Sequence, residues 1–163
     1  MANKKFAPSK PPTLVATLNR LEAECAAETS GLPQSVKGVL VSKDGKLLLM
    51  RRPGERGWDL PGGGVDAGES LADAFIRELM EEAGVSVDNA VPLYGYLRDI
   101  PGKDRKFIHY IGARLAKKAV KTKIKLSKEH DYFAFFQWAD ITELDFMPSY
   151  RKALDIARQL MTD

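Results

Sequence analysis

Cysteine is nearly absent from this 163-residue chain, in which Cys25 is the single thiol. One cysteine excludes an intramolecular disulfide framework and a cysteine-rich zinc site, which favours a reducing compartment. No apolar run approaches the roughly 18 residues that cross a bilayer. Residues 1–30 also lack the apolar stretch and the cleavage site of a secretory signal. We therefore expect a cytoplasmic protein that does not act in a membrane.

Strong charge of one sign is missing as well. The chain has 25 basic and 22 acidic side chains, a net charge of +3, which is too small to indicate a nucleic-acid-binding protein. The distribution is more informative than the sum. Acidic residues gather in 66–82, whereas 117–128 contains lysines and no acid. The lysines are interpreted most simply as a solvated face, but an acidic pocket with basic surroundings also suits an anionic ligand that arrives with a divalent metal.

The overall composition is that of one globular domain. Apolar residues make up 44% of the chain and charged residues 29%, so the chain can bury a core. A domain of this size removes roughly two-thirds of its unfolded surface from water and needs no disulfide or structural metal. We expect an N-terminal extension over 1–33, with a poorly ordered start and a helix over 14–30, followed by one domain over 34–163.

The order of the predicted elements indicates the fold class. Asp44-Gly45 is a preferred pair for a tight turn, and it predicts a hairpin between strands over 36–41 and 47–51. The clearest helix starts at Ser70, a capping residue, and ends at Gly84. The remaining expectations are a loop over 61–64, strands over 92–97, 107–115 and 133–140, and a closing helix over 149–161. Hairpins in place of regular alternation predict an α/β (α+β) fold with a mixed β-sheet sandwiched between helices.

Three carboxylates crowd the end of the helix over 70–83. Glu78, Glu81 and Glu82 share an arc of about 100° when successive residues are about 100° apart. Their mutual repulsion and the negative end of the helix dipole each cost a few tenths to about 1 kcal/mol. Arg77 alone cannot balance three negative charges. The cluster is either a solvated acidic face or a site for a hard divalent cation such as Mg²⁺, which takes carboxylate, phosphate and water oxygens as ligands.

The residues upstream favour the second interpretation. Gly63 is followed after five residues by Glu69, and after seven more by Arg-Glu-Leu-Met-Glu-Glu-Ala-Gly-Val over 77–85. This spacing matches the Nudix box at every position, and the chain resembles the Nudix hydrolase family. The resemblance extends over most of 36–144, with Glu129 and a strand carrying Trp138 after the box. It implies a Nudix-like version of the mixed sheet, to which the N-terminal helix is an addition.

The resemblance implies a reaction and a cofactor. Family members hydrolyse a nucleoside diphosphate linked to another moiety, and they require Mg²⁺ or Mn²⁺. A pyrophosphate resists attack by water because its oxygens are already negative. Metal ions screen that charge, polarise a phosphoryl oxygen and lower the pKa of the attacking water. We therefore expect metal-dependent hydrolysis of a pyrophosphate linkage in a small nucleotide.

The resemblance also assigns roles to residues of the box. It implies that Glu78, Glu81 and Glu82 bind the metal and that Arg77 orients these carboxylates. Either Glu78 or Glu129 is expected to activate the water, although an ordinary surface acid is an equally good interpretation of Glu129.

Two further groups are expected around this centre. Glu69 completes the hydrogen bonds that fix the ligands, while Gly63 and Gly64 let the backbone approach the phosphates. Cationic and aromatic side chains near the loop before the box are weaker candidates for substrate contacts: Arg51, Arg52, Arg56 and Trp58. Surface charge and core packing are the alternatives for these residues. The two histidines, His109 and His130, are isolated in the sequence, and neither is predicted to be a ligand.

The box cannot name the substrate. Nucleoside triphosphates and ADP-ribose-like compounds rank first, and RNA 5′ ends and dinucleoside polyphosphates are alternatives. A non-catalytic Nudix-fold module is a third possibility, although the box is intact. The apolar stripe of the N-terminal helix could dock on its own domain or on a second subunit, which leaves a monomer and a homodimer open.

Overall fold

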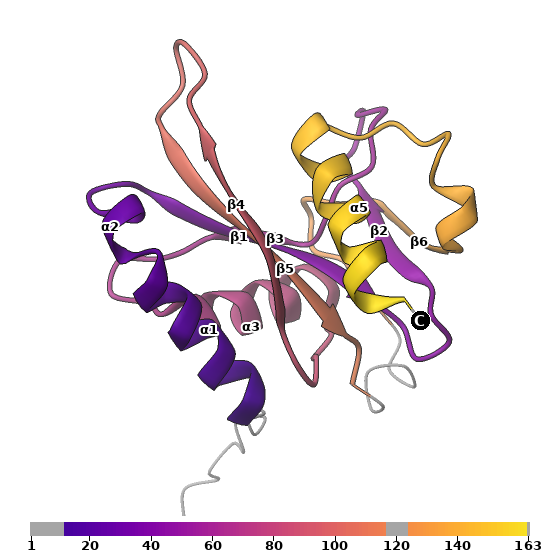
Figure 1. Cartoon of the computed structure of the whole chain (residues 1–163). Coiled ribbons are helices and arrows are strands. Elements are labelled where there is room, and N and C mark those ends of the chain that lie inside the picture. Colours follow the sequence, from indigo (N-terminus) through magenta and orange to yellow (C-terminus); the bar gives the residue numbers. More distant parts are fainter. Residues whose placement is uncertain (1–11, 117–123, 163) are drawn as a thin grey trace, which may run out of the picture.

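The computed structural model describes residues 12–116 and 124–162 (Figure 1). The predictions for residues 1–11 and for most of the lysine-rich segment fall outside these ranges. The helices are α1 (Pro12–Glu24), α2 (Ala26–Thr29), α3 (Leu71–Ala83) and α5 (Pro148–Met161), with a 3-10 helix, η1 (Trp138–Asp140). The strands are β1 (Gln34–Val41), β2 (Leu47–Arg51), β3 (Gly62–Gly64), β4 (Val91–Arg98), β5 (Lys106–Arg114) and β6 (Tyr132–Phe136).

The strands form one mixed sheet. Its order is β4-β5-β1-β2-β6, and β3 also pairs with β1. The central pair, β1 and β5, is parallel, while the other pairs are antiparallel. The mixed sheet expected from the element order is therefore confirmed.

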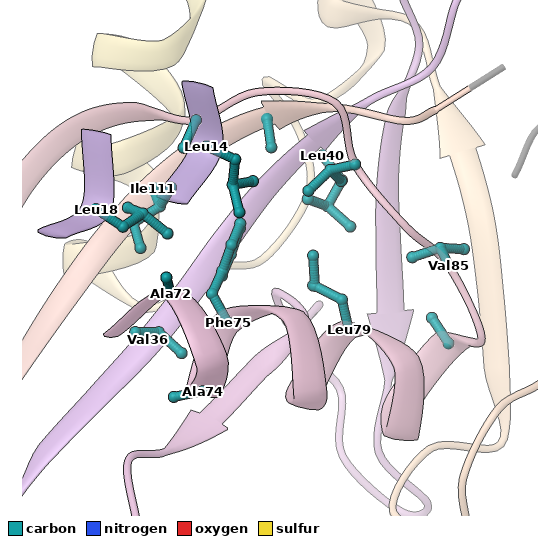
Figure 2. Packing of buried hydrophobic residues seen from close by; sticks show 14 of the residues in the cluster. Leu14, Leu18, Val36, Leu40, Ala72, Ala74, Phe75, Leu79, Val85 and Ile111 are labelled. Carbon is teal, nitrogen blue, oxygen red and sulfur yellow. The ribbon is translucent and has the colours of Figure 1, made fainter. Parts of the chain in front are cut away.

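Helices cover both faces of this sheet, as expected. On one face, α1 and α3 pack Leu14, Leu18, Phe75 and Leu79 against Ile111 of β5 (Figure 2). On the other face, α5 packs against the sheet through an apolar side that includes Leu154, Ala157 and Met161. Side chains of β1 alternate between the two cores, and this central strand is accordingly apolar on both faces.

The N-terminal helix belongs to the first of these cores. Leu14 and Leu18 are fully buried, so the apolar stripe of α1 docks on its own domain. Glu22 also accepts a hydrogen bond of 3.0 Å from the backbone N–H of Leu71, which satisfies a free donor at the start of α3. The expected single helix over 14–30 is interrupted at Cys25, where ψ is 2° instead of the helical value of about −42°.

Two expectations about the strands were wrong, and strand pairing explains both. The strand expected over 133–140 ends at Phe136 because Phe136 pairs with Leu47, the first residue of β2. Trp138 consequently lies in η1 and not on a strand. The glycine-rich segment expected to be a loop forms the short strand β3. This is possible because β2 pairs with β1 only at Leu40 and Val41, so the first half of β1 is free to pair with β3.

The predicted caps of α3 are confirmed. The Ser70 hydroxyl accepts a hydrogen bond from the backbone N–H of Asp73, and Gly84 ends the helix with a φ of 66°. Only glycine adopts this left-handed conformation without strain. Among the helices of the described residues, none has the length and apolar character needed to cross a bilayer.

Candidate active site

A cavity of about 630 Å³ opens beside β3 and the C-terminal half of α3. The β4–β5 hairpin, which projects from the sheet in Figure 1, contributes part of its wall. The acidic lining residues are Glu55, Asp59, Glu78, Glu82 and Glu129. The basic lining residues are Lys37, Arg52, Arg98, Lys103 and Lys106. The larger apolar and aromatic ones are Trp58, Ile108, Met147 and Tyr150.

Arg77 joins three carboxylates of the box. Its Nε and Nη2 donate to the two oxygens of Glu69 at 2.8 and 2.9 Å, a bidentate pair. Its Nη1 donates to Glu78 at 2.9 Å and to Glu81 at 3.1 Å, and its Nη2 also reaches the carbonyl of Gly64 at 2.9 Å. The hydrogen bond from Arg77 lowers the pKa of Glu69. The structure thus brings together the residues that the box predicted, with Arg77 fixing the side chains of its neighbours.

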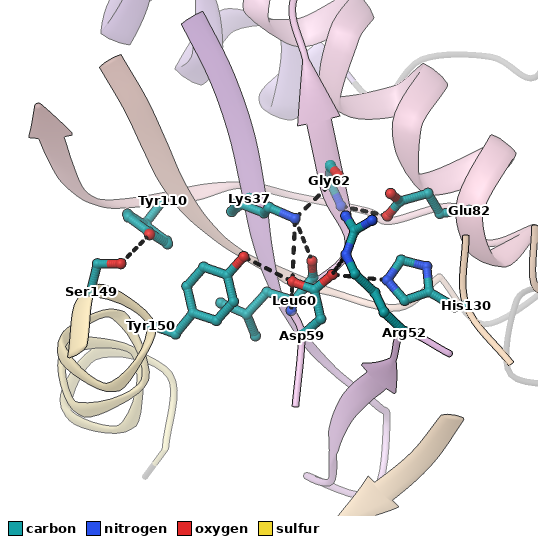
Figure 3. Close-up of polar contacts among 10 residues, drawn as sticks. All are labelled: Lys37, Arg52, Asp59, Leu60, Gly62, Glu82, Tyr110, His130, Ser149 and Tyr150. Atoms are coloured by element: carbon teal, nitrogen blue, oxygen red, sulfur yellow. Dashed lines mark hydrogen bonds and ion pairs between the residues drawn. The ribbon is translucent and has the colours of Figure 1, made fainter. Parts of the chain in front are cut away.

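Glu82 is the most buried of these acids, with 3% of its surface exposed. It accepts a 2.7 Å hydrogen bond from the backbone N–H of Gly62 (Figure 3) and forms no ion pair within 12–116 and 124–162. Burial raises the pKa of Glu82 to about 7, although the Gly62 N–H, Lys37 and His130 act to lower it. A divalent cation bound beside a buried carboxylate that lacks a cationic partner would keep this carboxylate ionised and use it as an oxygen ligand.

The side chain of Glu78 extends from α3 toward Gly63 of β3. Burial raises its pKa, and the hydrogen bond from Arg77 opposes that effect. A Cβ atom at position 63 would lie 2.6 Å from the Glu78 carboxyl group, whereas one at position 64 would meet nothing within 4 Å. Gly63 is therefore required for Glu78 to reach its position, which is a more specific reason than the flexible approach to phosphates that was expected.

A second set of possible metal ligands surrounds Glu82. One carboxylate oxygen of Glu82, one of Glu129 and one ring nitrogen of His130 lie within 4.8 Å of one another. Glu129 and His130 come from the loop before β6, which carries them to the C-terminal turn of α3. Glu78 is outside this set, and Glu81 is outside it too and has an exposed side chain. The two carboxylate oxygens suit Mg²⁺ or Mn²⁺, whereas the imidazole nitrogen suits softer ions such as Zn²⁺.

Asp59 anchors a buried network that the sequence analysis missed (Figure 3). Its carboxylate accepts hydrogen bonds from His130 Nε2 at 2.9 Å, Tyr150 Oη at 2.8 Å and the Leu60 N–H at 2.9 Å. The Arg52 Nε lies 3.1 Å from Asp59 and the Lys37 Nζ 3.4 Å. Burial acts to raise the pKa of Asp59, but these donors and cations outweigh it and hold the pKa well below its usual range. In the sequence, the one signal for this network was an isolated acid, Asp59, between the apolar residues Trp58 and Leu60.

The predicted substrate contacts divide into two groups. Arg52 and Trp58 line the cavity. Arg51 and Arg56 line a separate hollow of about 470 Å³, and the Arg51 guanidinium lies over the Trp58 ring at 5.4 Å. The sequence did not indicate Lys37, although a lysine in an otherwise buried central strand is a detectable anomaly.

A second missed group stands on the β4–β5 hairpin: Arg98, Lys103 and Lys106. Burial lowers the pKa of Lys106, and the nearby charges of Arg98 and Lys37 lower it further. The Nε of Arg98 is buried without a hydrogen-bond partner in the part of the chain that the structure describes. This wall of the cavity therefore holds cations that repel one another and a hydrogen-bond donor without an acceptor. A bound anion would reduce the repulsion and accept the hydrogen bond.

Comparisons with known proteins agree with this geometry. Segments of the chain resemble two RNA pyrophosphohydrolases, one from Sodalis glossinidius and one from Halorhodospira halophila. The first is 41% identical over 59 residues, 36% of this chain and 34% of that protein. The second is 32% identical over 83 residues, 51% of this chain and 41% of that protein. The chain thus spans less than half the length of these curated relatives.

Solved structures resemble the whole fold. The NUDIX domain of Shewanella oneidensis NrtR, complexed with ADP ribose, superposes with a TM-score of 0.67 at 20% identity, covering 86% of this chain and 99% of that one. An Ap4A hydrolase binary complex from C. elegans gives 0.65 at 22% identity, covering 80% and 98%. The family model of the NUDIX domain matches residues 31–159. With Glu78 and Glu82 of the box lining one cavity and this match over most of its length, the chain belongs to the Nudix family.

Proposed function

We propose that the chain hydrolyses the pyrophosphate linkage of a nucleoside diphosphate derivative, with Mg²⁺ or Mn²⁺ bound. The observation that supports this most is that one cavity holds both a buried acid without a cationic partner and a cluster of cations. Glu82 is a buried acid without a cationic partner among the described residues, whereas Arg98 and Lys106 belong to a crowded group of cations. A divalent cation with an anionic phosphate ester balances both groups at once.

The carboxylates of the box divide the work in this proposal. Glu78, Glu81 and Glu82 hold the cation, with Arg77 fixing the first two through its hydrogen bonds. The bound ion supplies charge screening, polarisation of a phosphoryl oxygen and a lowered pKa for a water molecule. Glu78 and Glu129 both line the cavity and are the two candidate bases for the attacking water.

The opposite wall binds the substrate. Arg52 and the hairpin cations face the phosphates, since guanidinium and ammonium groups donate several hydrogen bonds to phosphate oxygens. Trp58 lines the same cavity and contacts Phe136 edge to face, with ring centroids 4.8 Å apart. A ring held in this way stacks on a nucleobase at little entropic cost.

The test is a panel of substrates with and without Mg²⁺ or Mn²⁺. Nucleoside triphosphates, ADP-ribose and dinucleoside polyphosphates are each incubated with the wild type, and release of phosphate, pyrophosphate or nucleoside monophosphate is measured. We expect metal-dependent turnover on at least one small nucleotide. Glu82→Gln removes most of that turnover and keeps the fold, whereas Glu24→Gln, an exposed acid on α1, changes nothing. Normal metal-dependent turnover by Glu82→Gln would refute the assignment.

A 5′-triphosphorylated RNA is the second candidate substrate. Two observations favour it: the relatives described above are RNA pyrophosphohydrolases, and Arg98 and Lys103 extend the basic wall along the projecting hairpin. Phosphate contacts of this kind weaken steeply with salt. The panel therefore includes 5′-triphosphorylated RNA at two salt concentrations. Faster release of pyrophosphate from RNA than from nucleoside triphosphates identifies RNA as the substrate.

A module that binds nucleotides without catalysis is the outcome if the panel gives no product. Calorimetry then shows nucleotide binding in the absence of turnover. The complete box argues against this outcome, because a pure binding site has no need for three acids at the C-terminal end of α3.

A further inference from the structure

We infer that Nδ1 of His130 is a nitrogen ligand of the divalent cation, together with carboxylate oxygens of Glu82 and Glu129. The inference rests on the proposed function in one respect, namely that Glu82 holds a divalent cation. It departs from the set read from the box, because it adds an imidazole and gives Glu129 a ligand's place.

The position of the three side chains supports this set. A ring nitrogen of His130 and oxygens of Glu82 and Glu129 lie within 4.8 Å of one another, close enough to converge on one ion after small side-chain rotations. Glu82 and His130 are buried, and Glu129 is exposed, so the set has two anchored ligands and an open side toward the cavity. An open side is what a substrate needs to reach a bound metal.

Asp59 decides which nitrogen of His130 is available. A carboxylate accepts hydrogen bonds, so the ring nitrogen bonded to Asp59, Nε2, carries a hydrogen. In the neutral form of the ring, the remaining lone pair is therefore on Nδ1. Figure 3 shows the other ring nitrogen turned away from Asp59. Carboxylate–histidine pairs of this kind orient metal-binding imidazoles and raise their basicity in many metal sites.

The free lone pair has no other use in the described residues. The His130 side chain is 0% exposed, and its Nδ1 has no hydrogen-bond partner among them. A buried polar atom without a partner destabilises the fold. Coordination of a cation gives Nδ1 a partner, and it also neutralises the buried charge of Glu82 beside it.

The network behind His130 keeps the ring in this orientation. Tyr150 and Lys37 both hold the second oxygen of Asp59, at 2.8 and 3.4 Å. Asp59 therefore cannot turn without breaking bonds to α5 and β1. A ligand set with one nitrogen also shifts metal preference, since imidazole binds Zn²⁺ and Co²⁺ better than Mg²⁺.

Imidazole ¹⁵N NMR of the wild type tests the inference directly, with Zn²⁺ alone as the probe. The chain has two histidines, so the spectrum holds two rings, and His109→Gln assigns them. We expect Zn²⁺ to shift Nδ1 of His130 from the unprotonated position to that of a metal-bound nitrogen while His109 stays unmoved. Binding of one Zn²⁺, measured by calorimetry, without a shift of the His130 Nδ1 signal overturns the inference.

Metal affinities of variants provide the second readout. His130→Gln weakens Zn²⁺ binding on the order of tenfold or more, and it weakens Mg²⁺ binding less, because Mg²⁺ gains less from an imidazole ligand. His109→Gln, which alters a buried histidine outside the cavity, leaves both affinities unchanged. Equal weakening of Mg²⁺ and Zn²⁺ by His130→Gln contradicts nitrogen ligation. If His130→Gln does not fold, the wild-type spectrum still decides.

The two proposals fail in different ways. If the wild type hydrolyses nucleotides with Mg²⁺ and the His130 nitrogen does not respond to bound Zn²⁺, the inference is wrong and the proposed function stands. If neither Mg²⁺ nor Zn²⁺ binds to the wild type, the proposed function fails, and the inference fails with it.

Discussion

Replacement of Asp59 by asparagine tests the buried network behind the cavity. The amide keeps one acceptor oxygen but places an NH₂ group against donors. If the amide nitrogen takes the Oδ2 position, it faces the Arg52 Nε and His130 Nε2, which now lie 3.1 and 2.9 Å from that oxygen. If it takes the Oδ1 position, it faces Lys37, Tyr150 and the Leu60 N–H. Neither orientation satisfies all five donors.

The magnitude follows from these bonds. A hydrogen bond to a charged group contributes about 1.5–3 kcal/mol, and at least two of them are lost. Arg52 is partly exposed and regains water, which reduces its share. We expect the free energy of unfolding to fall by about 3 kcal/mol. For a domain of this size, that corresponds to a decrease in Tm of about 6–12 °C.

The pH dependence gives the sign of the same effect. Because the folded pKa of Asp59 lies below its unfolded value of about 3.9, its contribution to stability is complete well above that value. The contribution declines as the pH falls from there through the folded pKa. The difference between wild type and Asp59→Asn should therefore be constant from pH 8 to pH 5 and narrow below pH 4.

Urea unfolding, followed by tryptophan fluorescence and circular dichroism, measures both quantities. Asp131→Asn is the matched control, because Asp131 is exposed and its loss should change the free energy by less than about 0.5 kcal/mol. If Asp59→Asn unfolds within about 0.5 kcal/mol of the wild type, the network does not stabilise the fold as argued.

Three further predictions concern the site, pH and the N-terminal helix. Gly63→Ala displaces the Glu78 carboxyl group and lowers kcat by about tenfold or more, whereas Gly64→Ala, with open space at its Cβ, keeps kcat. Burial lowers the pKa of His109 to about 4, so the unfolded state binds a proton at a higher pH than the folded state. The free energy of unfolding of the wild type should therefore fall by about 3 kcal/mol from this histidine between pH 6.5 and pH 4. Urea unfolding at each pH should show that His109→Gln lacks this decrease. Leu18→Ala lowers the free energy of unfolding by about 2–5 kcal/mol, because the residue is fully buried; an unchanged urea midpoint would place α1 outside the core.

Local patterns in the sequence predicted the parts of the fold that depend on local rules. The caps of α3 follow from the capping ability of Ser70 and the left-handed freedom of Gly84, and both are seen. The spacing of the box likewise located Arg77 and the acids that it binds. These features lie within about one or two helical turns of one another, so the sequence spacing fixes their geometry.

The rest depends on pairing across the chain. His130 and Tyr150 lie 71 and 91 residues from Asp59, so no local pattern links them. The early end of β6 is set by where β2 begins, and the formation of β3 by the half of β1 that β2 leaves free. Register and long-range contacts of this kind are tertiary effects that local propensity does not contain.

Anomalous diffraction from crystals soaked in Mn²⁺ tests the central claim most directly, since the position of the ion does not depend on the choice of substrate. The account predicts a peak in the cavity within bonding distance of a Glu82 carboxylate oxygen, and its loss in Glu82→Gln. A cavity without a peak, at Mn²⁺ concentrations that saturate binding in calorimetry, would contradict the account.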